Sequence, residues 1–228
     1  GMVNEGIVST RLGLKGIPAL AEEIQIVRDL FILEYTGGKL HIPTISTANA
    51  VKLVSDAKKK GLDITCSAAI HNLCFTDDTL EEFDAAYKVL PPLRTKKDIT
   101  ALVKGLNDGV VDFITSDHIP MNIEQKRVEF DSAAFGSIGL ESAFGLLNQL
   151  FGIEKSIALL TKGRERYNIG ITQLKQGEKA SLTLFDPDEE YTFESDHILS
   201  TSKNSLALGK LLKGKVYGVF NKNQLILR

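Results

Sequence analysis

Residues 40–69, with the sequence LHIPTISTANAVKLVSDAKKKGLDITCSAA, contain the pattern that decides the fold class. The first three residues predict a short strand. Ser46 or Thr47 can then cap a helix with apolar residues at helical spacing, and Gly61 ends it. Residues 63–69 predict a second, buried strand. This strand–helix–strand order predicts two parallel strands joined by a right-handed crossover.

The same rhythm continues before and after this stretch. Apolar residues at three- and four-residue steps predict a helix over residues 17–36. Thr95, with Asp98 three residues later, predicts a capped helix, and residues 110–115 predict a third strand. Two further helices are predicted after this strand, over residues 139–150 and 154–167. We therefore expect an α/β fold with a parallel sheet covered on both faces.

The two ends of the chain differ from this middle. Before residue 17 we predict no leading strand, since Asn4-Glu5-Gly6 stands directly before the helical region. After Gly177 the pattern changes to short strands separated by turns. These strands are predicted over residues 181–185, 191–193, 215–220 and 224–227. A closed (β/α)8 barrel needs about 250 residues, so the residues alone fit either an open α/β sheet or the later part of a barrel.

The composition of the 228 residues excludes several classes of protein. Lysine and arginine total 27 against 29 acidic residues, so the net charge is -2 and no nucleic-acid partner is expected. The apolar runs are too short to span a bilayer, and no membrane association is expected. Cys66 and Cys74 do not make a disulfide framework, and we interpret them as reduced core thiols of a cytoplasmic protein.

Polar residues that can carry chemistry follow the three predicted strands. His41 and Thr44 lie at the first, His71 follows the second, and Asp117 with His118 follows the third. Such residues at successive strand ends can bind a metal ion or act as acid and base. Individual residues also have structural interpretations. His41 suits a hydrogen-bonded core position, and Asp117 also suits a helix cap or turn.

Four other positions also have more than one interpretation or a structural one. His118 can orient Asp117 or face solvent. Arg94 can bind an anionic group or form an ion pair with a neighbour. The turn at Phe135-Gly136 can present backbone amides to a ligand, although glycine is common in loops. His197 lies in the C-terminal β region, where a surface position is expected.

The stretch from Asp112 to Pro120, DFITSDHIP, resembles the signature of the dihydroorotase family, which typically reads S/T-D-H-A-P-H with a lysine a few residues later. Here that lysine is Lys126. The resemblance covers essentially all of the chain. It extends to Asn4-Glu5-Gly6, Gly16-Ile17-Pro18, Ile45-Ser46-Thr47, Pro91-Pro92-Leu93-Arg94, Phe135-Gly136, Ile138-Gly139-Leu140-Glu141 and Leu184-Phe185-Asp186-Pro187.

This resemblance implies a fold and its division into parts. The family has a metal-dependent (β/α)8 hydrolase barrel, with zinc as cofactor, and a small C-terminal β domain. Residues 1–172 would supply the later half of such a barrel, without its early strands, and residues 173–228 a β-sandwich portion. The histidine pair of the first barrel strand, which binds metal in the family, has no counterpart in this sequence.

The resemblance also assigns roles to residues that the sequence keeps. Asp117 would act as the general acid/base and lie beside the metal, and His71 would be a metal ligand. Phe135 and Gly136 would contact the substrate. The family reaction interconverts carbamoyl-aspartate and dihydroorotate in pyrimidine biosynthesis.

Several positions depart from the family pattern. Thr44 stands where the family has a metal-binding histidine, and Asn72 replaces the second histidine of the family's Pro-His-His-Leu. Leu90 and Met121 replace an asparagine and a histidine that contact substrate. Threonine is a poor zinc ligand, and apolar side chains cannot pair with an anionic substrate. We therefore expect a pseudoenzyme, or an enzyme of impaired activity.

Alternatives to this interpretation imply different partners. One is a non-catalytic structural partner of aspartate carbamoyltransferase, and another is a hydrolase of a different cyclic amide with a more apolar pocket. A homo-oligomer is also expected. An active enzyme would take dihydroorotate or carbamoyl-aspartate as its small-molecule substrate.

Overall fold

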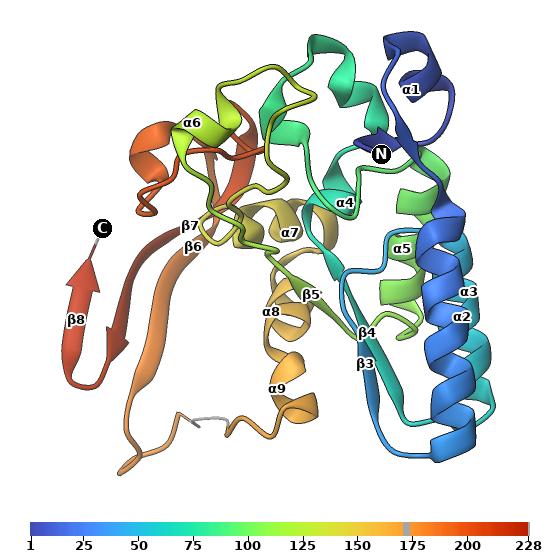
Figure 1. The fold of residues 1–228 in the computed structure, drawn as a ribbon. Coiled ribbons are helices and arrows are strands. Elements are labelled where there is room, and N and C mark those ends of the chain that lie inside the picture. The colour runs from blue at the N-terminus through green and yellow to red at the C-terminus, as the bar shows by residue number, and fades with distance from the viewer. Residues whose placement is uncertain (171–173, 228) are drawn as a thin grey trace.

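A three-stranded parallel sheet forms the centre of the molecule (Figure 1). The computed structural model describes residues 1–170 and 174–227, apart from the side chains of residues 81 and 82. The sheet has the order β3 (Leu40–Ile42), β4 (Ile64–Ala69) and β5 (Phe113–Thr115). Leu40 pairs with Ile64, and Ala69 with Thr115. The predicted parallel strand–helix–strand unit is therefore confirmed.

Two helices cross over between these strands, and both begin where capping residues predict. Helix α3 (Ala48–Lys59) begins after Thr47, whose side chain accepts a hydrogen bond of 3.0 Å from the amide of Ala50. Helix α5 (Lys96–Asn107) begins after Thr95, which forms a capping box with Asp98. These local hydrogen bonds satisfy amides that the helix itself leaves unpaired, so the sequence alone locates both helix starts.

The third strand is shorter than its prediction over residues 110–115. The amides of Val110 and Val111 both donate to the carbonyl of Gly105, at 2.8 and 3.0 Å, and so extend the turn at the end of α5. The Asp112 carboxylate accepts a hydrogen bond of 2.8 Å from the amide of Cys66 and pairs with Lys58. The strand therefore begins at Phe113.

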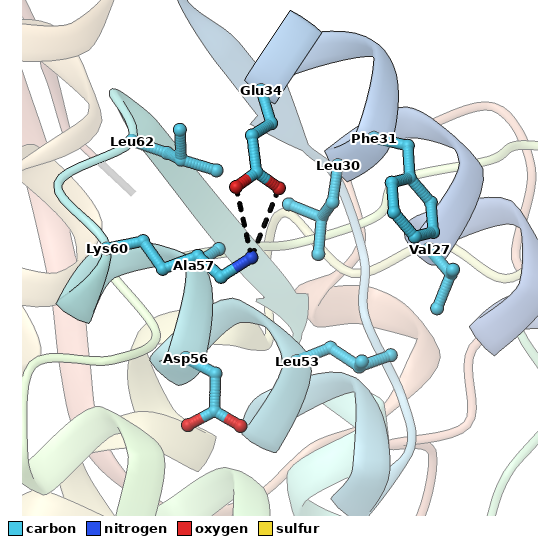
Figure 2. Close-up of a pocket in the computed structure, with 9 residues that line it drawn as sticks. All are labelled: Val27, Leu30, Phe31, Glu34, Leu53, Asp56, Ala57, Lys60 and Leu62. Atoms are coloured by element: carbon cyan, nitrogen blue, oxygen red, sulfur yellow. Dashed lines mark hydrogen bonds and ion pairs between the residues drawn. The ribbon is translucent and has the colours of Figure 1, made fainter.

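Helix α2 (Ala19–Thr36) packs beside α3 and leaves a groove of about 160 Å³ between the two (Figure 2). Leu30 and Leu53 are among the apolar residues that line this groove, and Lys60 pairs with Glu34 at 3.1 Å across it. The helix predicted over 17–36 is confirmed from Ala19 onward, and Pro18 is its N-cap. Helix α2 also carries a row of exposed apolar side chains, up to 91% exposed at Tyr35. The row consists of Leu20, Ile24, Phe31 and Tyr35, of which Phe31 also lines the groove.

The N-terminal segment corrects the prediction that no strand precedes the first long helix. Strand β1 (Val3–Asn4) pairs in parallel with β2 (Gly16–Ile17), and helix α1 (Ile7–Leu12) lies between them. The Val3 side chain is buried in a small separate cluster that also contains Phe130. Two-residue strands are too short to leave a recognisable alternation in the sequence.

Short helices connect β4 to α5 and follow β5. The first group consists of α4 (His71–Cys74) and two 3-10 helices, η1 (Asp77–Glu82) and η2 (Ala85–Tyr87). The elements after β5 are α6 (Ile123–Lys126), α7 (Ala143–Phe151), α8 (Ile153–Thr161) and α9 (Gly163–Arg166). The predicted helix over 139–150 thus begins later, because His118 accepts hydrogen bonds from the amides of Gly139 and Leu140. The helix predicted over 154–167 is divided at Lys162.

The C-terminal region is an antiparallel sheet with the order β6 (Ser181–Thr192), β7 (Leu211–Asn221) and β8 (Gln224–Leu227). It lies on the side of the molecule away from α2 and α3 (Figure 1). The two strands predicted over 181–185 and 191–193 are one strand here. Its pairing with β7 shifts register between Asp186 and Glu190, next to Pro187, which has no amide to donate.

The main core joins the two regions. Leu102 of α5 and Leu147 of α7 belong to the same buried cluster as Phe193 and Leu212 from the C-terminal region. Both cysteines are free, and burial raises the pKa of each thiol to about 12. Among the residues that the structure describes, no helix combines the length and apolar character that a membrane span needs.

Candidate active site at the strand ends

The carboxyl ends of the three parallel strands lie at one edge of the sheet and carry the polar residues of interest. Thr44 follows β3, His71 follows β4, and Asp117 follows β5. Because Ala69 and Thr115 are paired in register, the segments that contain His71 and Asp117 leave the sheet side by side. This edge is the usual position of ligand sites in βα folds.

The structure brings His71 and Asp117 together. Nε2 of His71 lies 3.7 Å from Oδ2 of Asp117, slightly beyond a hydrogen bond. The imidazole is buried, and its Nε2 has no hydrogen-bond partner among the residues that the structure describes. Burial lowers the pKa of His71 to about 4, and burial raises the pKa of Asp117. The pair therefore combines a neutral imidazole with a carboxyl group that keeps its proton more readily than usual.

Thr44 and Asp117 both have a backbone in the left-handed region, with φ angles of 48° and 44°. This conformation is strained for most residues, and especially for a β-branched one such as Thr44. The amide of Thr44 donates to Oγ of Ser67 at 3.4 Å, which helps to hold the loop in place. Strained residues of this kind cluster at functional sites, so the strain supports a functional assignment for this edge.

His41 occupies a structural position. Its ring stacks on Phe113 at a centroid distance of 4.9 Å, and its two nitrogens lie 3.0 and 3.3 Å from the hydroxyls of Thr65 and Ser67. Burial and the nearby Arg166 guanidinium lower the pKa of His41. The core interpretation of this residue therefore agrees with the structure.

No hydrogen bond or ion pair between His118 and Asp117 is found among the described residues. Nδ1 of His118 accepts the amides of Gly139 and Leu140, each at 3.3 Å, and so ties the strand-end loop to the segment before α7. In the neutral ring the proton then resides on Nε2. Gly139 itself allows this close approach, since a Cβ there would lie 2.3 Å from the carbonyl oxygen of Ser116.

The positions predicted to contact substrate lie in the loops around this edge. Leu90 is 51% exposed, and the amide of Met121 donates to Oδ1 of Asn204 at 3.4 Å. The carbonyl of Gly136 accepts Lys126 Nζ at 2.9 Å and Asn204 Nδ2 at 3.1 Å. The Phe135 ring lies 5.1 Å from Nζ of Lys88. The carbonyl of Gly136 therefore stabilises the loop by accepting these two hydrogen bonds.

Two buried lysines, Lys88 and Lys126, hold this loop. Lys88 donates to the carbonyls of Phe130 and Asp131, and Lys126 donates to those of Ala134 and Gly136. Burial of a lysine is unusual and is offset here by carbonyl acceptors. Lys126 is visible in the sequence only as part of the family resemblance, and nothing in the local pattern indicates that Lys88 is buried.

Arg94 forms an ion pair with its neighbours, which was one of its two interpretations. The buried guanidinium donates to Oγ of Ser46, Oδ1 of Asn4 and the carbonyl of Ile17, and lies 3.6 Å from the Glu22 carboxylate. It thus connects the N-terminal segment to the sheet. His197 is not freely exposed, because its ring stacks on Phe193 and lines a cavity in the C-terminal region.

The donor set of this edge does not complete a metal site. Among the side chains that the structure describes, which exclude those of residues 81, 82, 171–173 and 228, no group of three or more histidine, cysteine, aspartate or glutamate residues is placed to hold a metal ion. His71 and Asp117 supply two donors, whereas a catalytic zinc ion needs about three protein ligands. The side chains described here therefore do not fit a zinc site by themselves.

Comparison with known proteins gives close relatives over nearly the whole chain. A scan against protein-family models finds no match. The chain is 40% identical over 226 residues to the dihydroorotase of Thermoanaerobacter sp. (strain X514), covering 95% of this chain and 52% of that protein. It is 37% identical over 236 residues to the dihydroorotase of Pelobacter propionicus, covering 100% and 55%. The chain thus spans about half the length of the curated relatives it matches.

Solved structures support the fold. The L-hydantoinase (dihydropyrimidinase) of Arthrobacter aurescens matches with a TM-score of 0.80 at 23% identity, over 89% of this chain and 48% of that one. An inactive dihydroorotase-like domain of the CAD-like multifunctional protein of Chaetomium thermophilum matches with a TM-score of 0.64 at 19% identity, over 88% and 54%. These matches confirm the predicted α/β fold, a partial barrel with a small β region. Over about half the length of these curated relatives, the chain is similar to dihydroorotases.

Proposed function

We propose that this chain is a dihydroorotase-like cyclic amidohydrolase whose catalysis is impaired or absent. The family reaction adds water across one C–N bond of dihydroorotate to give carbamoyl-aspartate, or reverses this step. The observation that carries the proposal is the incomplete donor set: His71 and Asp117 approach to 3.7 Å, while the position expected to supply a further ligand is Thr44. Zinc binding is therefore expected to be weak or absent.

Residual chemistry at this edge would fall to Asp117. Because burial raises the pKa of its carboxyl group, Asp117 is better suited than an exposed aspartate to pass a proton to the leaving amide nitrogen. The neutral, unpartnered Nε2 of His71 can accept a hydrogen bond from a water molecule or from substrate. A dihydroorotate carboxylate near Leu90 and Met121 would have no side-chain donor from either residue.

A structural role is the second candidate. The relative from Chaetomium thermophilum is described as an inactive dihydroorotase-like domain within a multifunctional protein, so this fold occurs without its activity. The exposed apolar row on α2 would suit a protein neighbour. We propose aspartate carbamoyltransferase as that neighbour and a homo-oligomeric, cytoplasmic assembly. In it, residues 1–172 form the barrel portion and residues 173–228 the β-sandwich portion.

Bound zinc per chain is the first measurement, made by elemental analysis on the complete gene product purified without added metal or chelator. A value near zero is expected. The restored variant T44H/L90N/M121H should bind zinc and hydrolyse dihydroorotate, whereas the control variant Thr36→His, on the exposed end of α2, should do neither. One or two zinc ions in the unaltered protein, with turnover of dihydroorotate, would rule out the impaired state.

The structural role has a separate test. Size-exclusion chromatography of the complete gene product, alone and with aspartate carbamoyltransferase from the same organism, should give a shared peak if the two assemble. Replacing Phe31 with aspartate should abolish that peak, while replacing the exposed Lys59 with aspartate should not. Separate elution at micromolar concentrations would exclude this partner.

A further inference from the structure

A larger cavity lies in the C-terminal half of the molecule and shares no lining residue with the strand-end site. Its volume is about 310 Å³, about twice that of the groove beside α2. Its walls come from α7 and Glu141, two positions before that helix, from the 3-10 helix η3 (Ser195–His197), and from strands β6 and β7. A cavity of this size can hold a small organic molecule.

Two carboxylates stand in the walls. Oε1 of Glu141 accepts the amides of Leu199 and Ser200 at 3.1 and 2.9 Å, but its Oε2 is enclosed and accepts no hydrogen bond among the described residues. A buried carboxylate oxygen without a donor is unfavourable, so a donor brought into the cavity would be stabilised if the side chain rotates towards it. Asp196 is 78% exposed, and its Oδ1 lies 3.0 Å from Nδ1 of His197, which also lines the cavity.

The one lysine of the lining, Lys215, is already neutralised. Its Nζ lies 2.7 Å from Oε1 of Glu189, and 5.9 and 5.7 Å from the ring centroids of Tyr191 and Tyr217. With Lys215 paired in this way and histidine counted as neutral, the formal charge that remains in the walls is that of Glu141 and Asp196. The cavity therefore carries a formal negative charge.

Aromatic rings form much of the remaining wall. Tyr191, Tyr217 and Phe144 all line the cavity, and Phe144 is held by an edge contact with Phe185 at 5.2 Å. Ring faces attract cations and pack against flat apolar groups. Negative charge and aromatic walls together favour one chemical class of ligand.

We propose that this cavity binds a small organic cation, a protonated amine or guanidine attached to a flat apolar body. The cationic group lies towards Glu141 and Asp196, and the flat body packs against the tyrosine rings. The sequence does not reveal this site, because its residues come from segments up to 76 positions apart, Glu141 and Tyr217. The inference is independent of catalysis at the strand ends.

The test uses tyramine, an aromatic ring with an ammonium group, and its neutral counterpart 4-hydroxyphenylethanol. Isothermal titration of the full chain at low salt should detect tyramine binding and at least tenfold weaker binding of the neutral compound. Asp196→Asn and Tyr217→Leu should each weaken tyramine binding several-fold. Lys213→Met is the matched control, because this residue of β7 pairs with Asp188 and does not line the cavity.

Each alternative result overturns the proposal in a distinct way. Equal binding of the two compounds would show that charge plays no part. Tyramine binding that survives both Asp196→Asn and Tyr217→Leu would place the ligand elsewhere. No tyramine binding by a chain with a cooperative melting transition would leave the cavity without this class of ligand. Glu141→Gln is kept as a secondary variant, since this side chain also holds the segment before β7.

Discussion

The parallel sheet and the antiparallel sheet of this molecule differ in how far their strands are buried. In β4 all residues except Thr65 are buried, because helices cover the strand. In β8 all four residues are exposed. Crossover helices cover a parallel sheet as part of the same connection, whereas antiparallel strands joined by tight turns depend on other elements for cover. Stability should therefore be concentrated in the parallel region.

The polar contacts of the two regions differ in the same direction. The guanidinium of Arg94 is buried in a network with Asn4, Ser46 and Glu22. In the antiparallel region, the pair of Lys213 with Asp188 is largely exposed. Buried networks fix a structure because their partners have no water to replace a lost contact, while exposed pairs contribute little.

The largest expected effect comes from removing the Arg94 guanidinium. Arg94→Met should lower the free energy of unfolding by about 3–5 kcal/mol, because buried acceptors and the Glu22 carboxylate lose their donor. Lys213→Met should cost less than about 1 kcal/mol. Urea unfolding followed by circular dichroism measures both. Similar losses in the two variants would contradict the distinction between the regions.

The next comparison is between the stability effects of a buried leucine of α5 and an exposed leucine of the antiparallel sheet. Leu102→Ala should destabilise the protein by about 2–5 kcal/mol, since the side chain is 0% exposed and its removal leaves a cavity. Leu225→Ala in β8, where the side chain is 54% exposed, should change stability by less than about 0.5 kcal/mol. A large loss for Leu225→Ala would mean that the exposed sheet face is covered in solution.

Lys126 gives a pH dependence of definite sign. Burial and the Lys88 ammonium lower its pKa to about 8, against 10.5 in the unfolded chain, and Asp84 offsets part of this shift. Between these values the unfolded chain holds a proton that the folded chain has lost, so stability rises with pH, by at most roughly 3 kcal/mol. Lys126→Met should remove this rise between pH 8 and 10.5. The exposed variant Lys104→Met should keep it, and an unchanged slope in Lys126→Met would refute the assignment.

The smallest expected effect is a gain in stability at the strand ends. Thr44→Gly should stabilise the fold by about 0.5–1 kcal/mol, because relief of the left-handed strain exceeds the entropic cost of glycine. Thr36→Gly, at the end of helix α2, should instead lose about 0.5–1 kcal/mol. Thermal melts of the two variants give the sign of each stability change. A lower melting temperature for Thr44→Gly would contradict the strain inferred at Thr44.

Local signals explain how much of the fold the sequence could predict. The unit over residues 40–69 was predictable because caps at Thr47 and periodic apolar residues act within one turn of helix. The short β1–β2 pair and the continuity of β6 were not, because they depend on pairing between strands. The family resemblance predicted an α/β partial barrel, and the comparisons confirm it.

The candidate site was predictable only in part. Residues at successive strand ends indicated His71 and Asp117, and their catalytic and metal-binding roles stay predictions. The Arg94 network was not predictable, since Asn4 and Arg94 are 90 positions apart. The burial of Lys88 was not predictable for a similar reason, because its carbonyl acceptors on Phe130 and Asp131 lie 42 and 43 positions away along the chain.

The apolar row on α2 has a practical consequence for work with the isolated chain. In the folded chain, solvent reaches the apolar side chains of this row, which are Leu20, Ile24, Phe31 and Tyr35. Fluorescent dyes that brighten on apolar surfaces are commonly used to detect molten or partly denatured protein. With this chain, such a dye will brighten on a correctly formed helix, and retention on phenyl resin will report the same row rather than misfolding.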